Sequence, residues 1–164
     1  MEGSRFSFKS TTQARHGYLC TMSTSSVVDI RQAEIIEEFE MFPDWMEKYE
    51  HIIEIGKELD AIDEKSKVDE NLIKGCQSRV WLAAELNEEG KVIFTADSDA
   101  IITKGLVALM IRVLSDATPV EIAESNLHFL EAIGLNSHLS PTRSNGLLSM
   151  VKQMKMYGLA FSVR

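Results

Sequence analysis

Strand-like patterning is confined to one short region of the sequence, and this grouping constrains the fold more than any other feature. Apolar side chains stand at every second position over 80–86 and again over 92–96, which is the period of a strand with one buried face. The residues between them, 87–90, end in a glycine that can adopt a positive φ, so an antiparallel hairpin is predicted. The other sustained apolar patterns have helical spacing. The sequence therefore predicts an α+β fold, a small antiparallel β-sheet packed against several α-helices.

Helical patterns precede the hairpin. Apolar residues recur at helical spacing over 29–41 and over 45–59. Asp44, with Glu47 three residues later, has the form of a capping box that opens the second of these helices. The highly charged run over 60–70 has no apolar period and is predicted to be an exposed connection.

The residues after the hairpin predict the central element of the core. Positions 100–114 are apolar on nearly every side, which is typical of a buried helix. Asp97 or Ser98 is predicted to cap this helix, since both are favoured N-cap residues.

Further helices follow toward the end of the chain. Thr118 to Glu121 combine an N-cap threonine, proline at the first helical position and glutamate at the third, which predicts a helix start with a capping box. Residues 127–133 form another helical segment that stops near Gly134. Ser140-Pro141 opens a last helix by the same logic, and Gly158 is predicted to end it.

Composition excludes several classes of protein. The chain has 164 residues and a formal net charge of −8, so it lacks the broad basic surface that nucleic-acid binding requires. No apolar run approaches the roughly 20 residues of a membrane-spanning helix. Its two cysteines, Cys20 and Cys76, are too few for a disulfide framework, a four-cysteine zinc site or a self-contained iron–sulfur cluster. We therefore expect no nucleic-acid partner and no membrane partner.

The first 22 residues differ in character from the rest. They are rich in Ser and Thr, carry three basic residues against one acid, and lack the apolar core of a secretory signal. We expect residues 1–22 to be a disordered tail or an extended upstream start, and residues 23–164 to form a single domain. The expected location is cytoplasmic, or organellar if residues 1–22 act as a transit segment.

Cys76 is the residue best placed to carry chemistry. It follows Gly75 at a junction between a loop and a strand, where a rigid scaffold can present a reactive side chain, although free cysteines are more often buried structural residues. Lys74 or Arg79 would lower the pKa of the thiol if either folds beside it. The sequence alone leaves the reactive and the structural interpretations open.

A hydrolytic Cys76 would need a histidine base. The candidates are His16, His51, His128 and His138, of which only His138 occupies a loop before a helix. A stand-alone cysteine-nucleophile hydrolase is therefore an open alternative.

Two polar clusters have simpler explanations than ligand binding. Asp97 to Asp99 resembles half of a metal site, but carboxylates at a helix start are first explained by capping and by the helix dipole. Thr142 to Gly146 could hold an anion near a helix N-terminus, yet capping with a surface arginine explains the same residues.

Four segments taken in order resemble one family. They are Asp44-Trp45 with Tyr49 and 53–56, then Gly75 to Trp81, then Ala96 to Ala100, and last His138 to Leu147. This succession resembles the SufE family of sulfur-acceptor proteins in iron–sulfur cluster assembly, over about residues 29–157. The resemblance implies a SufE/NifU-like α+β fold.

The resemblance also implies a function. A SufE-like protein takes persulfide sulfur from a SufS-like cysteine desulfurase onto Cys76, stimulates the desulfurase, and passes the sulfur to a SufBCD-like iron–sulfur scaffold. Such a chain is a sulfurtransferase-like carrier and activator more than a stand-alone enzyme, and it has no cofactor of its own because PLP belongs to the desulfurase. It is expected to be a monomer or a weak homodimer. An iron–sulfur scaffold is excluded because about three ligating cysteines would be needed, and Cys76 is the only one after Met22.

Family pattern places two more residues near Cys76. Arg143 is expected to stabilise thiolate or persulfide charge, and Asp99 to hold the Cys76 loop through backbone hydrogen bonds. A carrier must shelter its persulfide until it docks, so Cys76 is expected to be partly buried on a loop that moves out at the partner's active site.

Overall fold

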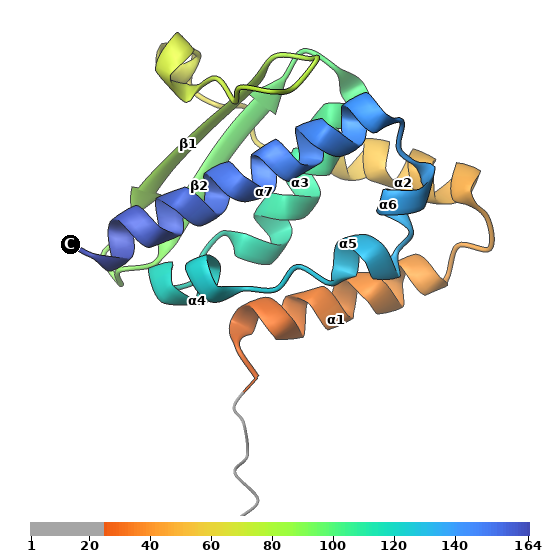
Figure 1. Cartoon of the computed structure of the whole chain (residues 1–164), viewed down its shortest axis with the longest axis horizontal. Helices are drawn as coiled ribbons and strands as arrows, with labels where there is room; N and C mark the ends of the chain where they lie inside the picture. Colours follow the sequence, from red (N-terminus) through yellow and green to blue (C-terminus); the bar gives the residue numbers. More distant parts are fainter. Residues whose placement is uncertain (1–24) are drawn as a thin grey trace, which may run out of the picture.

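The computed structural model describes residues 25–164 (Figure 1). The predicted boundary at residue 22, the tail before it, Cys20 and His16 lie outside the described residues. The helices and strands are α1 (Val27–Glu40), α2 (Trp45–Lys57), β1 (Val80–Leu86), β2 (Val92–Ser98), α3 (Ile101–Leu114), α4 (Pro119–Glu124), α5 (Phe129–Ala132), α6 (Leu135–His138) and α7 (Pro141–Ser162). The predicted α+β fold, with a small antiparallel sheet against several helices, is confirmed.

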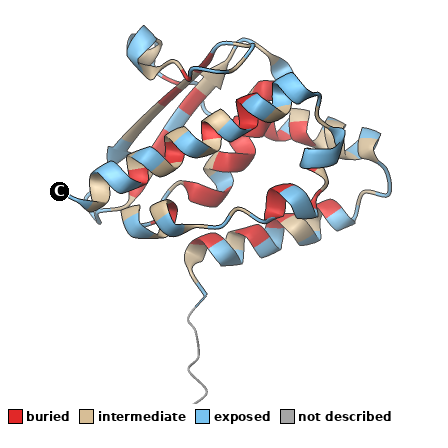
Figure 2. Cartoon of the chain, in the orientation of Figure 1, coloured by how far each residue is buried: buried red, intermediate tan, exposed pale blue. Residues whose placement is uncertain are grey.

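Helix α3 forms the centre of the core, as its sequence predicted. It packs against α1, α2, α7 and β2, and most of its residues are buried (Figure 2). Its contact with α2 is unusually close, because Gly105 of α3 lies against Gly56 of α2 with no side chain between the two backbones. A Cβ added at Gly56 would lie 2.7 Å from the backbone nitrogen of Gly105.

The two strands form an antiparallel hairpin, as predicted. Leu82 pairs with Ala96 and Ala84 with Phe94, so the apolar positions of both strands face the helices. The connecting residues include Gly90 at φ 76°. Helix α7 covers part of this inner face, where the ring of Tyr157 meets the ring of Phe94 edge-on at 6.3 Å between centroids.

The predicted cap of α3 is wrong. Strand β2 continues through Asp97 to Ser98, and α3 begins only at Ile101, with Ala100 as an N-cap that makes no side-chain hydrogen bond. The Asp97 carboxylate instead pairs with Lys67 at 3.0 Å and with Lys104 at 3.3 Å. These ion pairs and the pairing with β1 explain why Asp97 remains in the sheet.

The predicted end of the last helix is also wrong. Helix α7 continues through Gly158 to Ser162. A Cβ at Gly158 would lie 2.8 Å from Ile122 Cγ2 and 2.9 Å from the backbone oxygen of Pro119, so this glycine allows α7 to pack closely on α4. The same residue type that often ends a helix serves here as a packing contact.

The charged connection has more local structure than predicted. It contains two single-turn 3-10 helices, Glu64–Ser66 and Asp69–Asn71, and Ile62 within it is buried. Besides its ion pair with Asp97, Lys67 lies over the ring of Trp81, so it makes two contacts with the sheet. The connection is therefore mostly exposed, but the buried Ile62 and the contacts of Lys67 anchor it to the domain.

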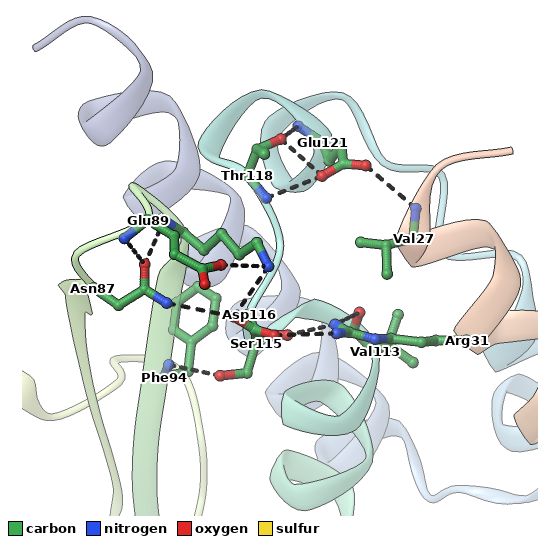
Figure 3. A network of polar contacts seen from close by, with 11 residues as sticks. Val27, Arg31, Asn87, Glu89, Phe94, Val113, Ser115, Asp116, Thr118 and Glu121 are labelled. Carbon is green, nitrogen blue, oxygen red and sulfur yellow. Dashed lines mark hydrogen bonds and ion pairs between the residues drawn. The ribbon is translucent and has the colours of Figure 1, made fainter. Parts of the chain in front are cut away.

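The turn between α3 and α4 joins distant parts of the chain (Figure 3). Asp116 adopts a positive φ of 58°, a conformation that aspartate tolerates better than most residues. Its carboxylate lies 3.9 Å from Arg31 of α1 and 3.8 Å from Lys91 of the hairpin loop. Next to it, Thr118 and Glu121 form the predicted capping box of α4.

No helix within residues 25–164 combines the length and apolar character that crossing a membrane requires.

Candidate functional site

Cys76 lies on a tight loop that leads into β1. Gly75, immediately before it, has φ 92°, a conformation that side chains other than glycine rarely adopt. A Cβ at Gly75 would lie 2.7 Å from the hydroxyl of Ser149, so the loop is pressed against α7. The glycine thereby lets the chain turn close to α7 and places the cysteine on that helix.

The thiol faces a small pocket of about 90 Å³. The pocket is bounded by the Cys76 loop and by the N-terminal halves of α3 and α7. Its lining residues are Cys76, Gln77, Ser78, Ala100, Ile102, Thr103, Leu106, Thr142, Arg143, Gly146 and Met150. Its volume exceeds the about 10–15 Å³ that a single water occupies, so one further atom bonded to the thiol can be accommodated.

The Cys76 thiol is half-buried and lies beside the backbone of α7. Its Sγ donates to the backbone oxygen of Gly146 at 3.5 Å. Burial raises the pKa of the thiol above its ordinary value. Neither Lys74 nor Arg79 contributes to this shift, so the lowering of the pKa that either would cause beside the thiol is absent here. Burial and the contact with Gly146 both favour the protonated thiol in this geometry.

Arg143 and Asp99 occupy different positions relative to this pocket. Arg143, in the first turn of α7, lines the pocket and is otherwise exposed. Asp99 does not line it, but its carboxylate accepts a hydrogen bond from the backbone nitrogen of Arg79 at 3.0 Å. The backbone nitrogen of Asp99 in turn donates to the oxygen of Arg79 at 3.3 Å. Asp99 therefore bonds to the residue at the end of the loop that bears Cys76, and the roles expected of Arg143 and Asp99 stay predictions.

Two helix N-termini meet at the pocket. The first turn of α3 contributes Ile102 and Thr103, and the first turn of α7 contributes Thr142 and Arg143. Neither helix has a side-chain cap, so their first backbone N–H groups are not occupied by capping oxygens. Such termini carry partial positive charge and favour an anion.

The structure brings no histidine to the pocket among residues 25–164. His51 is bonded to the carboxylate of Glu38. His138 stacks on Trp45 with ring centroids 4.3 Å apart, and its Nδ1 lies 2.8 Å from the backbone oxygen of Gly134. His128 lies beside the backbone oxygen of Asn126. The base that a cysteine hydrolase needs is therefore absent from the described part of this site.

Sequence reasoning missed several residues that build the pocket. Thr103 is a buried polar residue whose hydroxyl lies 3.4 Å from that of Ser78, and it holds the loop against α3. Its polarity within a mostly apolar helix was the available signal. Gly146 contacts Cys76 although the two are 70 residues apart in sequence, and Met150 lines the same pocket. No local sequence pattern predicts such long-range contacts.

Within residues 25–164, no three His, Cys, Asp or Glu side chains gather as they would around a metal ion.

Known proteins resemble this chain over most of its length. The family model described as "SufE: Fe-S metabolism associated domain" matches residues 33–158. A SufE-like protein of Synechocystis sp. (strain ATCC 27184 / PCC 6803 / Kazusa), itself called uncharacterized, is 41% identical over 131 residues, which cover 80% of this chain and 82% of the relative. The solution structure of a hypothetical protein from Thermus thermophilus superposes with a TM-score of 0.69, covering 82% of this chain and 97% of that one. At 18% identity, the second likeness concerns the fold alone.

Proposed function

This chain belongs to the SufE family, whose domain is associated with Fe–S metabolism, and we propose that it carries persulfide sulfur on Cys76 from a cysteine desulfurase to an iron–sulfur scaffold. The observation that carries the proposal is the pocket at Cys76. It holds a single thiol with room for one more atom, lacks a histidine base among the described residues, and includes a cationic side chain, Arg143. These properties suit storage of a sulfur atom better than turnover of a substrate.

The loading step is an exchange between sulfur atoms. The Cys76 thiolate attacks the outer sulfur of the persulfide on the desulfurase cysteine, so that a new S–S bond forms on Cys76. The S–S bond in the donor breaks, and the donor cysteine leaves as a thiolate. No external oxidant or reductant is consumed, because the sulfane sulfur changes partners without a net change in oxidation level.

The unloading step repeats this chemistry with a new nucleophile. A thiolate of the acceptor attacks the outer sulfur on Cys76, and Cys76 leaves as a thiolate. PLP chemistry stays with the desulfurase, so this chain needs only one thiol.

Activation requires that the loop move. In the resting geometry burial raises the pKa of Cys76 and its proton is directed to Gly146. Release of the loop from α7 would return the thiol to water, lower its pKa, and expose it to the partner. In the closed state, Arg143 and the uncapped starts of α3 and α7 favour the negative charge of a bound persulfide.

The test measures cysteine turnover by a SufS-like desulfurase in the presence of the chain. We expect the wild type to increase the rate of alanine formation from cysteine, and Cys76→Ser to abolish the increase, because the serine hydroxyl cannot accept sulfane sulfur. Cys20→Ser is the matched control and should stimulate as the wild type does. Equal stimulation by wild type and Cys76→Ser would contradict the proposal, and esterase or amidase activity of the isolated chain that Cys76→Ser removes would favour the hydrolase instead.

A further inference from the structure

An apolar groove lies between α4 and α7, away from the Cys76 pocket. It has a volume of about 400 Å³, and its walls are mainly aliphatic side chains. Leu148, Met156 and Leu159 line it and are 60%, 53% and 59% exposed. Large aliphatic side chains gathered on one face and open to solvent mark an interaction surface more often than isolated ones do.

The charge around this groove opposes the charge of the chain. Lys152 and Lys155 are its only charged lining residues, and neither has a carboxylate partner within 4.0 Å among residues 25–164. No acidic residue follows Glu131, although the whole chain has 25 acidic residues and a net charge of −8. A basic and apolar strip is thus set on an acidic protein, which favours an occupant that is apolar on one side and acidic at its edges.

The groove is continuous with the residues that lead to Cys76. A neighbouring depression shares Lys152 and Met156 with the groove and extends to Ser149 and Lys74. The acidic Asp69 and Glu70 also line this depression, but they do not line the groove itself. Ser149 is the residue against which Gly75 is pressed. A partner seated in the groove would therefore contact α7 beside the loop that must open.

We propose that the groove between α4 and α7 docks an acidic amphipathic helix of the cysteine desulfurase that loads Cys76. This inference rests on the proposed function and adds to it the place and the chemistry of recognition. The apolar face of the helix would cover Leu148, Met156 and Leu159, while its acidic edge pairs with Lys152 and Lys155.

A second copy of this chain fits the groove less well. Helix α1 carries more acidic residues than any other described helix and is the one a second copy would offer, but its apolar residues Val28, Ile35 and Phe39 are already buried in its own core. Of the large apolar residues in α1, Ile30 alone is exposed, so α1 has little free apolar surface to place in the groove.

The experiment measures sulfur loading of Cys76 by a SufS-like desulfurase as a function of chain concentration. The double variant Lys152→Glu/Lys155→Glu should raise the half-saturating concentration about 10-fold at low ionic strength, with less effect on the plateau rate, because it acts on docking. The matched control is Lys48→Glu/Lys65→Glu, which changes the net charge by the same amount. Both lysines lie outside the groove and form no ion pair within the described residues, so this variant should behave as the wild type.

A second pair of variants tests the apolar part of the groove. Met156→Gln should weaken docking, whereas Met41→Gln, at an exposed methionine at the end of α1, should not.

The outcomes separate the docking proposal from the proposed function. Equal half-saturating concentrations for wild type and Lys152→Glu/Lys155→Glu would overturn the docking proposal and leave the carrier function standing. An equal loss in both double variants would overturn it as well, because net charge alone would explain the loss. A concentration-dependent dimer that Met156→Gln abolishes, together with undiminished loading, would assign the groove to a second copy and also overturn it. A wild type that a small-molecule persulfide loads but no tested desulfurase loads would contradict the proposed function itself.

Discussion

Gly75 controls how closely the Cys76 loop lies against α7. Replacing it by alanine forces a side chain into a left-handed conformation, which costs about 1–2 kcal/mol, and also displaces the Ser149 hydroxyl. We predict that Gly75→Ala shifts the loop toward its open form and accelerates alkylation of Cys76 by iodoacetamide about 5- to 30-fold. Gly90→Ala is the matched control, since Gly90 also has a positive φ but a Cβ there would contact nothing within 4 Å. Equal alkylation rates in the two variants would show that Gly75 does not hold the loop.

The pH dependence of alkylation tests the electrostatics at Cys76. Burial raises the pKa of the thiol, so the thiolate that reacts appears at higher pH than in an unfolded chain. The folded chain should therefore show a midpoint of alkylation rate above that of a short peptide spanning Cys76. Its stability should fall as pH rises from the peptide's pKa through the folded pKa, because the unfolded thiol loses its proton first. A midpoint below that of the peptide would mean that Arg143 or the helix N-termini outweigh burial.

At the scale of single residues, the sequence predicts which side chain can react better than it predicts which residues contact that side chain in the fold. Cys76 stands out because it follows a glycine at the start of a strand, and this signal is local. The contact of its thiol with Gly146 joins residues 70 apart and depends on how α7 crosses the molecule. The loop contact of Asp99 was expected from family pattern, whereas the polar contact of Thr103 with Ser78 was not.

The packing of α2 on α3 depends on two glycines. Gly105→Ala would place a methyl group against the backbone oxygen and side chain of Ile52, where no space remains. We predict a loss of about 1–3 kcal/mol in the free energy of unfolding, measured by urea denaturation, despite the better helix propensity of alanine. Gly146→Ala is the control within a helix, since its nearest atom would be Cys76 Sγ at 3.4 Å. Equal losses would contradict the importance of the close backbone contact.

At the scale of elements, helix starts were predicted better than helix ends and strand ends. The capping box at Thr118 forms as predicted, whereas at Asp44 only the N-cap bond from the backbone nitrogen of Glu47 forms; both are local arrangements of a few residues. The end of α7 and the end of β2 depend on partners far away in sequence. Gly158 stays helical because α4 packs on it, and Asp97 stays in the strand because Lys67 and Lys104 hold it.

One ion-pair network joins the first three long helices. Glu38 of α1 accepts two hydrogen bonds from Arg112 of α3, at 3.1 and 2.8 Å, and contacts His51 of α2. The pKa of Glu38 is lowered mainly by the hydrogen bond from Arg112 and further by the one from His51. Burial opposes this lowering. A lowered carboxylate pKa stabilises the fold above the unfolded pKa, and this stability is lost as the pH falls through the folded pKa.

Glu38→Gln should therefore affect stability in a pH-dependent way. We predict that the variant loses about 1–2 kcal/mol at pH 7. Its deficit should shrink as the pH falls from the pKa of an unfolded glutamate, about 4.3, through the lower pKa of the folded wild type, where the carboxylate becomes protonated. Thermal denaturation at pH 7 and at acidic pH measures the deficit. Glu50→Gln is the control, because Glu50 is an exposed glutamate without a hydrogen-bond partner among the described residues. A deficit that is the same at both pH values would contradict the role of the charge.

For the whole molecule, the grouping of strands was enough to predict the fold class. The single hairpin and the apolar segment at 100–114 require a small sheet on a central helix, and the structure has this arrangement. The pocket required more than the sequence pattern, because it forms where α3, α7 and the Cys76 loop meet. Under the proposed function, this pocket would shelter the labile sulfur atom on Cys76 between the two partners.

The most direct test of the account is intact-mass spectrometry with peptide mapping after incubation with cysteine and a SufS-like desulfurase, without reductant. We predict that the Cys20→Ser variant gains one sulfur atom, that the gain maps to Cys76, and that a reductant removes it. The same gain on Cys76→Ser, or no gain on any variant although Cys76 remains free to react with iodoacetamide, would contradict the claim that Cys76 carries sulfur.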